Sequence, residues 1–173
     1  LTLQIPRQVN LHVQLRHKGD IEIEKIDGTV DLSTKHGDIA LRHIRGSAKV
    51  ETVNGDVLIQ DLQGERATIT TVNGDTTLNN LRVERLTIQA TNGDTETERL
   101  IARNCTVETV RGDITLDLIE PIQGEVRLTT VSGDILVQVP DGNDCRVQMQ
   151  TSAGTIECAL ECKQIESSRH HYT

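Results

Sequence analysis

Thr52-Val53-Asn54-Gly55-Asp56 returns as Thr71-Val72-Asn73-Gly74-Asp75, and this pair is the clearest part of a longer internal repeat. A Gly-Asp dipeptide occurs seven times at intervals of 18 to 21 residues, and Gly154-Thr155 forms a degenerate eighth copy. A repeat of this period is typical of a solenoid, in which each repeat is one structural unit. We therefore predict structural turns at Gly19, Gly37, Gly55, Gly74, Gly93, Gly112 and Gly133.

Apolar residues keep fixed distances from the Asp of each repeat. In the first repeat Ile21, Ile23 and Ile26 follow the Asp by one, three and six residues, and Val30 and Leu32 precede the next Asp by eight and six. Because alternate side chains of a strand point to one face, the spacing of two predicts short strands with one buried face. One further column lies six residues after each Asp. We assign to it Ile26, Ile44, Leu62, Leu81, Leu100 and Ile119.

Such a repeat cannot bury its apolar face alone, whereas stacked coils can. The sequence therefore predicts an all-β fold, a parallel single-stranded β-helix (β-solenoid) of about eight coils of 18–21 residues. We expect right-handed coiling, because parallel β crossovers strongly favour that hand. We expect one solenoid domain over residues 1–162, in which residues 1–18 form an N-terminal capping strand, followed by a polar C-terminal tail over residues 163–173.

The composition restricts the classes of function. A net charge of −8 at pH 7 over 173 residues argues against a nucleic-acid surface. Aromatic residues make up 1% of the chain, so it lacks the side chains that stack on sugar rings, and we expect neither an enzyme nor a cofactor. No apolar run reaches the roughly 20 residues that cross a bilayer. The chain starts at Leu1, and we expect any targeting signal or membrane anchor to lie outside this segment.

The repeated Asp is the most tempting metal-binding position. Stacking would place these carboxylates about 4.8 Å apart along one edge. They could form a cation ladder, as in calcium-binding β-rolls, or accept hydrogen bonds from the backbone amides of their own turns. We favour the second interpretation and expect no metal, because each turn supplies one Asp. The candidate ladder consists of Asp20, Asp38, Asp56, Asp75, Asp94, Asp113 and Asp134.

A second polar column lies four residues before the Asp. Its spacing places it on the same face as the apolar columns, so we predict a hydroxyl-bonded internal ladder rather than an exposed threonine array. The column consists of Thr34, Thr52, Thr71, Thr109, Thr130 and Thr151.

Other suggestive residues have plain interpretations. Arg111-Gly112-Asp113 spells the integrin tripeptide, but Arg111 occupies a variable turn position, and we expect no integrin recognition. The histidines share no column and are expected on the solvated surface; they are His12, His17, His36, His43, His170 and His171. The cysteines lack the CxxC spacing of a zinc or redox site, and whether Cys145 or Cys162 forms a disulfide stays open; they are Cys105, Cys145, Cys158 and Cys162.

The repeated Thr-Val-Asn-Gly-Asp motif, with its variant Thr109-Val110-Arg111-Gly112-Asp113, resembles a bacterial domain family called toastrack, which also carries an adhesin label. The opening Ile5-Pro6, followed by an alternating strand, is similar to the usual start of that domain. The resemblance implies a single-stranded β-helix of unknown function, often attached to transmembrane segments and linked to cell-envelope stress systems. It implies no catalytic residues.

We therefore expect a non-enzymatic structural or interaction module of the bacterial cell envelope, an adhesin-like β-helix that binds a partner through its strand faces or edges. The alternative is a self-polymerising cytoskeletal scaffold of bactofilin type. We expect a protein or cell-envelope partner and no nucleic acid, with self-association through the solenoid ends as a further mode. We expect a cell-envelope or extracytoplasmic location, with the cytoplasm as the alternative.

Overall fold

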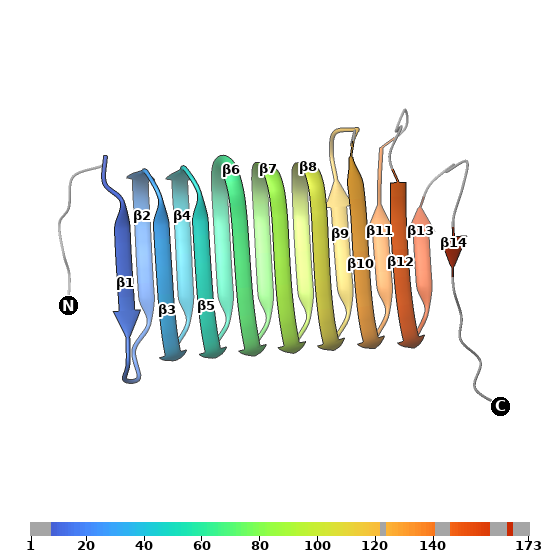
Figure 1. The fold of residues 1–173 in the computed structure, drawn as a ribbon, viewed down its shortest axis with the longest axis horizontal. Helices are drawn as coiled ribbons and strands as arrows, with labels where there is room; N and C mark the ends of the chain where they lie inside the picture. The colour runs from blue at the N-terminus through green and yellow to red at the C-terminus, as the bar shows by residue number, and fades with distance from the viewer. Residues whose placement is uncertain (1–7, 122–123, 141–145, 160–165, 168–173) are drawn as a thin grey trace.

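The computed structural model describes residues 8–121, 124–140, 146–159 and 166–167. The chain forms a parallel β-solenoid of about seven turns, whose coils follow one another along the long axis of the molecule (Figure 1). The strands are β1 (Leu11–Leu15), β2 (Ile21–Asp27), β3 (Val30–His36), β4 (Ile39–Arg45), β5 (Ala48–Asn54), β6 (Val57–Asn73), β7 (Thr76–Asn92), β8 (Thr95–Arg111), β9 (Ile114–Leu118), β10 (Glu125–Ser132), β11 (Ile135–Gln138), β12 (Arg146–Ala153), β13 (Ile156–Ala159) and β14 (Glu166–Ser167).

The strands form two stacks with a common axis. The first stack contains β1, β3, β5, the second halves of β6, β7 and β8, and then β10, β12 and β14. The second stack contains β2, β4, the first halves of β6, β7 and β8, and then β9, β11 and β13. Every one of these pairings is parallel, which confirms the predicted fold class. The right-handed sense of coiling stays a prediction.

The predicted apolar columns form the core. Ile21 pairs with Ile39 and Ile39 with Val57, so residues one position after each Asp lie directly above one another. Columns from both stacks meet in a narrow interior, where side chains such as Leu41 and Ile59 are fully buried. Ladders of aliphatic residues suit this interior because each coil adds the same cross-section to the core.

The column six residues after the Asp depends on a backbone feature that the apolar pattern does not show. Five coils place a residue with φ between 54° and 61° just before this column, so the chain gains one residue without reversing the buried face. These residues are Lys25, His43, Asp61, Asn80 and Arg99. The next coil lacks such a residue, and Leu118 rather than Ile119 pairs with Leu100. The assignment of Ile119 to this column was therefore wrong: Leu118 is buried, and Ile119 is 39% exposed.

The described parts of both ends continue the solenoid. In β1, Leu11 pairs with Val30 and Leu15 with Thr34, so the expected capping strand is the first rung of the first stack. At the other end, within the expected polar tail, β14 pairs with β12. Ile5-Pro6 at the start and the rest of the tail lie outside the described residues.

Threonines interrupt the apolar core in the middle coils. Thr76, Thr95 and Thr97 are at most 1% exposed, and their hydroxyls have no hydrogen-bond partner among the described residues. Thr97 lies in register between Leu78 and Leu116. A buried hydroxyl without a partner lowers the free energy of unfolding, because its hydration is lost without replacement.

We predict that Thr97→Val stabilises the fold by about 1–2 kcal/mol, because it removes this hydroxyl at nearly constant volume. The matched control is Thr130→Val, since the equally buried Thr130 hydroxyl donates to the Gly112 carbonyl at 3.2 Å. That change should destabilise the fold by about 1 kcal/mol. Urea unfolding of both variants measures the difference, and equal effects of the two changes would contradict the prediction.

Candidate functional site

One corner of the solenoid carries the repeated motif, and we call it the Asn-Gly-Asp edge. It consists of the four residues from three positions before each Asp to the Asp itself, for example Val53 to Asp56. These residues lead from the end of a first-stack strand into the next second-stack strand. Strand pairing superposes the positions of successive coils, as in the pairing of Asn54 with Asn73 and of Asn73 with Asn92.

The glycines let successive corners touch. The predicted turn glycines from Gly37 to Gly133, and Gly154 of the degenerate repeat, have φ between +134° and +154°, which side chains rarely allow. A Cβ on any of them would lie 2.0–2.2 Å from the carbonyl oxygen of the preceding turn glycine. Gly19 is the exception, because the nearest atom to its Cβ would be Leu15 Cδ1 at 3.6 Å. Glycine is therefore required wherever one turn rests on another.

The Asp carboxylates bond between coils. In each coil the Asp Oδ1 accepts the backbone N–H of the Asp in the following coil, at 2.7–3.0 Å from Asp20 through to Asp134. The prediction that each carboxylate bonds within its own turn was therefore wrong. The prediction that backbone amides occupy the carboxylates is confirmed for one oxygen of each.

The ladder of backbone hydrogen bonds explains why this bond is needed. Gly55 N–H donates to Asn73 O and Val57 N–H to Asp75 O, both in the following coil. The N–H of Asp56, between them, faces the preceding coil and meets Asp38 Oδ1 at 2.9 Å. The Asp38 carboxylate thus accepts the one backbone N–H of this corner, that of Asp56, which makes no strand hydrogen bond.

The C-terminal end of this row replaces the Asp by Thr155. Its backbone N–H and its hydroxyl both donate to Asp134 Oδ1 at 2.6 Å. Both hydrogen bonds lower the pKa of the Asp134 carboxyl because they favour its charged form, and the bond from the hydroxyl has the larger effect. The degenerate eighth repeat therefore keeps the inter-coil bond.

Side-chain amides form a second ladder beside the carboxylates. Asn73 Nδ2 donates to Asn54 Oδ1 at 2.9 Å, and Asn92 Nδ2 donates to Asn73 Oδ1 at 2.8 Å. Arg111 Nη1 extends the ladder by donating to Asn92 Oδ1 at 3.0 Å. At the other end, Asn54 Nδ2 lies 3.1 Å from His36 Nδ1. Arg111 of the Arg-Gly-Asp tripeptide is thus a rung of this ladder, and Asp113 is a rung of the carboxylate row.

The threonine column faces inward, as predicted, but its hydroxyls are only partly bonded. Thr130 and Thr151 donate to the Gly112 and Gly133 carbonyls at 3.2 and 3.0 Å. The buried hydroxyls of Thr34, Thr52 and Thr71 have no hydrogen-bond partner in the described part of the chain. The prediction of a hydroxyl-bonded ladder therefore holds only for the later coils.

The position three residues before the Asp exposes apolar side chains. Val53, Val72, Val110 and Val131 are 37–50% exposed, although each directly follows a buried Thr. We call them, with Thr91 in the intervening coil, the valine stripe. The stripe was not predicted from the sequence, although the Val of each Thr-Val-Asn-Gly-Asp motif was its signal.

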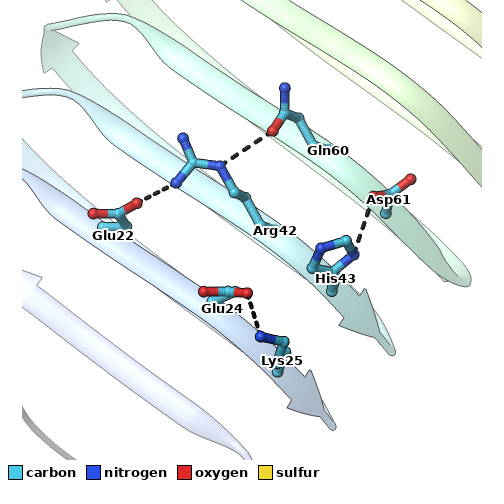
Figure 2. Close-up of polar contacts among 7 residues, drawn as sticks. All are labelled: Glu22, Glu24, Lys25, Arg42, His43, Gln60 and Asp61. Carbon is cyan, nitrogen blue, oxygen red and sulfur yellow. Dashed lines mark hydrogen bonds and ion pairs between the residues drawn. The ribbon is translucent and has the colours of Figure 1, made fainter.

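A charged surface covers the outer side of β2, β4 and β6 (Figure 2). Arg42 lies between Glu22, with which it forms an ion pair, and Gln60, whose Oε1 accepts its Nε–H at 3.1 Å. His43 Nδ1 lies 3.0 Å from Asp61 Oδ2. These contacts lie at the surface, where ion pairs contribute little stability.

Lys25 and Glu24 form a further ion pair on the same surface, 2.6 Å apart (Figure 2). The Lys25 ammonium donates a hydrogen bond to Glu24 and, with its charge, lowers the pKa of that carboxyl. The surface therefore consists of neighbouring charges that neutralise one another.

The remaining predicted candidates do not meet. His12 pairs with Asp31 at 3.2 Å, and His12, His17, His36 and His43 are exposed, as expected. Cys105 is a buried free thiol, and burial raises its pKa to about 12, so it is unreactive. Cys145, Cys162, His170 and His171 lie outside the described residues.

The described residues hold neither a cluster of metal-ligating side chains nor a membrane-spanning helix. Among them, no three His, Cys, Asp or Glu side chains are placed to hold a metal ion together. The expected absence of a metal stays a prediction. The same residues include no helix of the length and apolar character that would cross a bilayer.

The family model Toastrack DUF4097 matches residues 1–173, so the chain belongs to this family of β-solenoids of unknown function. The family resemblance of the repeated motif is thereby confirmed. No curated protein and no solved structure matches the chain.

We predict that Gly74→Ala destabilises the protein by about 3 kcal/mol or more, since it combines a strained φ of +138° with a Cβ 2.2 Å from Gly55 O. Gly19→Ala is the matched control and should cost less than about 1 kcal/mol. Thermal unfolding by circular dichroism compares the two. A mild effect of Gly74→Ala would show that the corners are not in close contact.

We predict that Asp75→Ala destabilises the protein by about 1–2 kcal/mol, because Asp94 N–H loses its acceptor. Asp75→Asn should stay within about 0.5 kcal/mol of the native protein, since an amide oxygen also accepts and repulsion along the row falls. Asn10 Oδ1 shows the same bond, accepting Thr29 N–H at 3.0 Å. A rise in melting temperature that calcium but not magnesium causes, and that Asp75→Asn abolishes, would support the cation ladder instead.

Proposed function

We propose that this Toastrack domain is a non-enzymatic interaction module of the cell envelope that binds a protein partner along its Asn-Gly-Asp edge. The observation that carries the proposal is the valine stripe. Single exposed apolar residues are normal on protein surfaces, but a contiguous exposed apolar patch is typical of interaction sites. Here a Val occupies the same exposed position in four of five consecutive coils, and the half-buried Thr91 occupies it in the other.

The geometry of the edge supports a binding role rather than a catalytic one. Its carboxylates repeat at equal spacing, and one oxygen of each accepts a backbone N–H. General acid–base chemistry needs groups of different character that converge on one reacting atom. The edge instead offers the same row of groups to a partner at every coil. The cell-envelope setting is supported by the family resemblance.

The alternative function is a self-polymerising scaffold of bactofilin type. Contact between two copies through the valine stripe would bring two rows of carboxylates together, and like charges oppose such a contact. We therefore favour a different partner at this edge.

We predict that the paired substitution Val72→Thr with Val110→Thr removes at least 90% of a partner protein that copurifies with the native domain from its own cells. Threonine keeps the branched Cβ and already occupies the stripe at Thr91, so the fold should persist. The control is Ile119→Thr, an exposed apolar residue away from the edge. Quantitative mass spectrometry of the three samples gives the comparison.

Two outcomes would contradict the proposal. Equal recovery of the partner by the native domain and the paired variant would exclude the edge as its binding site. Concentration-dependent filaments of the purified domain, seen by electron microscopy, would support the scaffold instead.

A further inference from the structure

We propose that the segment bound at the valine stripe is a cationic amphipathic α-helix of about 13 residues, lying parallel to the solenoid axis. This inference rests on the proposed function and adds the chemistry of the partner. It follows from the spacing of the stripe and from the charges along its two sides.

The spacing of the stripe matches a helix better than an extended segment. Successive coils lie about 4.8 Å apart, so the four steps from Val53 to Val131 cover about 19 Å. One turn of an α-helix advances about 5.4 Å, so residues three or four apart can meet successive coils, and about 13 residues cover the stripe. Same-face residues of an extended segment lie about 6.6 Å apart and lose this register within two coils.

An Asp row borders the stripe on its turn side, and two of its five coils add a Glu on the strand side. On the turn side each Val is three residues from an Asp, so their Cα atoms are within about 11 Å. These are Asp56, Asp75, Asp94, Asp113 and Asp134. On the strand side, Glu51 and Glu108 lie two residues before Val53 and Val110 and therefore on the same outer face.

Most of this negative charge has no counter-charge within the turns of the stripe's own five coils, although Lys35 occupies the stripe position in the coil before Val53. One oxygen of each carboxylate accepts a backbone N–H, and in the described residues Oδ2 of Asp56, Asp75 and Asp94 has no hydrogen bond. Arg111 is the cation within the stripe's own coils at the turn, and it donates to Asn92. Lys49 forms an ion pair with Glu51 at 2.7 Å. An apolar stripe with a continuous Asp row on its turn side and Glu51 and Glu108 on its strand side is complementary to a helix with an apolar face flanked by Lys or Arg.

The same charges disfavour other occupants. A second copy would place its own acidic borders against these, and an anionic lipid surface would be repelled. An apolar segment without charge would leave the carboxylates without partners. A cationic helix satisfies both the apolar and the charged parts of the edge.

The test uses a designed 14-residue helical peptide, with capped ends, in which Leu at spacings of three and four is flanked by Lys. One control peptide has the same residues in an order without an apolar face, and a second replaces every Lys by Glu. Fluorescence anisotropy at low and high salt measures binding to the whole domain. We expect the Lys helix to bind at least tenfold more tightly than either control.

Protein variants then separate the two parts of the edge. Val72→Thr with Val110→Thr should weaken binding of the Lys helix at least tenfold. Asp75→Asn with Asp94→Asn should weaken binding about fivefold and flatten its salt dependence, because fewer charges are neutralised. Ile119→Thr should leave binding unchanged. Circular dichroism confirms that each variant keeps the native strand content.

Each contrary outcome has a defined meaning. Equal binding of the Lys helix and its scrambled control would show attraction by charge alone and overturn the inference. Tighter binding of the Glu helix, or no binding of the Lys helix while the valine variant still loses the cellular partner, would overturn the cationic helix and leave the proposed function intact. Retention of that partner by the valine variant would instead overturn the proposed function itself.

Discussion

The close contact between successive corners is the constraint on which the whole solenoid depends. The Cα of each turn glycine, from Gly37 onward, faces the carbonyl of the preceding one at a distance that excludes any Cβ. Glycine allows this close approach. The backbone N–H of the Asp that follows it takes no part in the strand hydrogen bonds, and the Asp carboxylate of the preceding coil accepts it instead. The spacing of the strands, and with it the alignment of the aliphatic columns, follows from this contact. The two residues of the Gly-Asp motif therefore have separate and complementary roles.

The fold could be predicted because every coil of a solenoid repeats the same local structure. Every coil needs the same glycine and the same inward residues, so periodicity alone identifies the turns and the buried columns, including Ile59 and Leu78. The hand of the coil is not contained in that pattern. The error at Ile119 arose because the extra left-handed residue, such as Asn80 in an earlier coil, has no fixed chemical identity. A conformation that Lys, His, Asp, Asn and Arg all adopt cannot be recognised from residue type in a single sequence.

The candidate site was less predictable than the fold, because its interactions join residues of different coils. A single repeat shows an Asp beside its own turn, and local rules then favour a hydrogen bond within that turn. Only the stacked structure shows that the nearest unsatisfied donor belongs to the next coil. The amide ladder from Asn54 to Asn92 depends in the same way on superposition. Val72 was visible in the motif, but its exposure depends on the direction of its side chain beside the corner.

The hydrogen bond between a carboxylate and the next coil is directional, and it does not restrict the number of coils that can follow one another. The carboxylate of each corner accepts a hydrogen bond from the next coil, and the backbone N–H of the same corner donates one to the preceding coil. Every coil therefore forms the same contact with both of its neighbours. Duplication or loss of one coil's coding sequence therefore leaves the remaining contacts unchanged, provided that a whole period is gained or lost. Thr155 donates twice to Asp134 of the preceding coil and has no carboxylate of its own. Evolution can in this way adjust the length of the edge in steps of one coil.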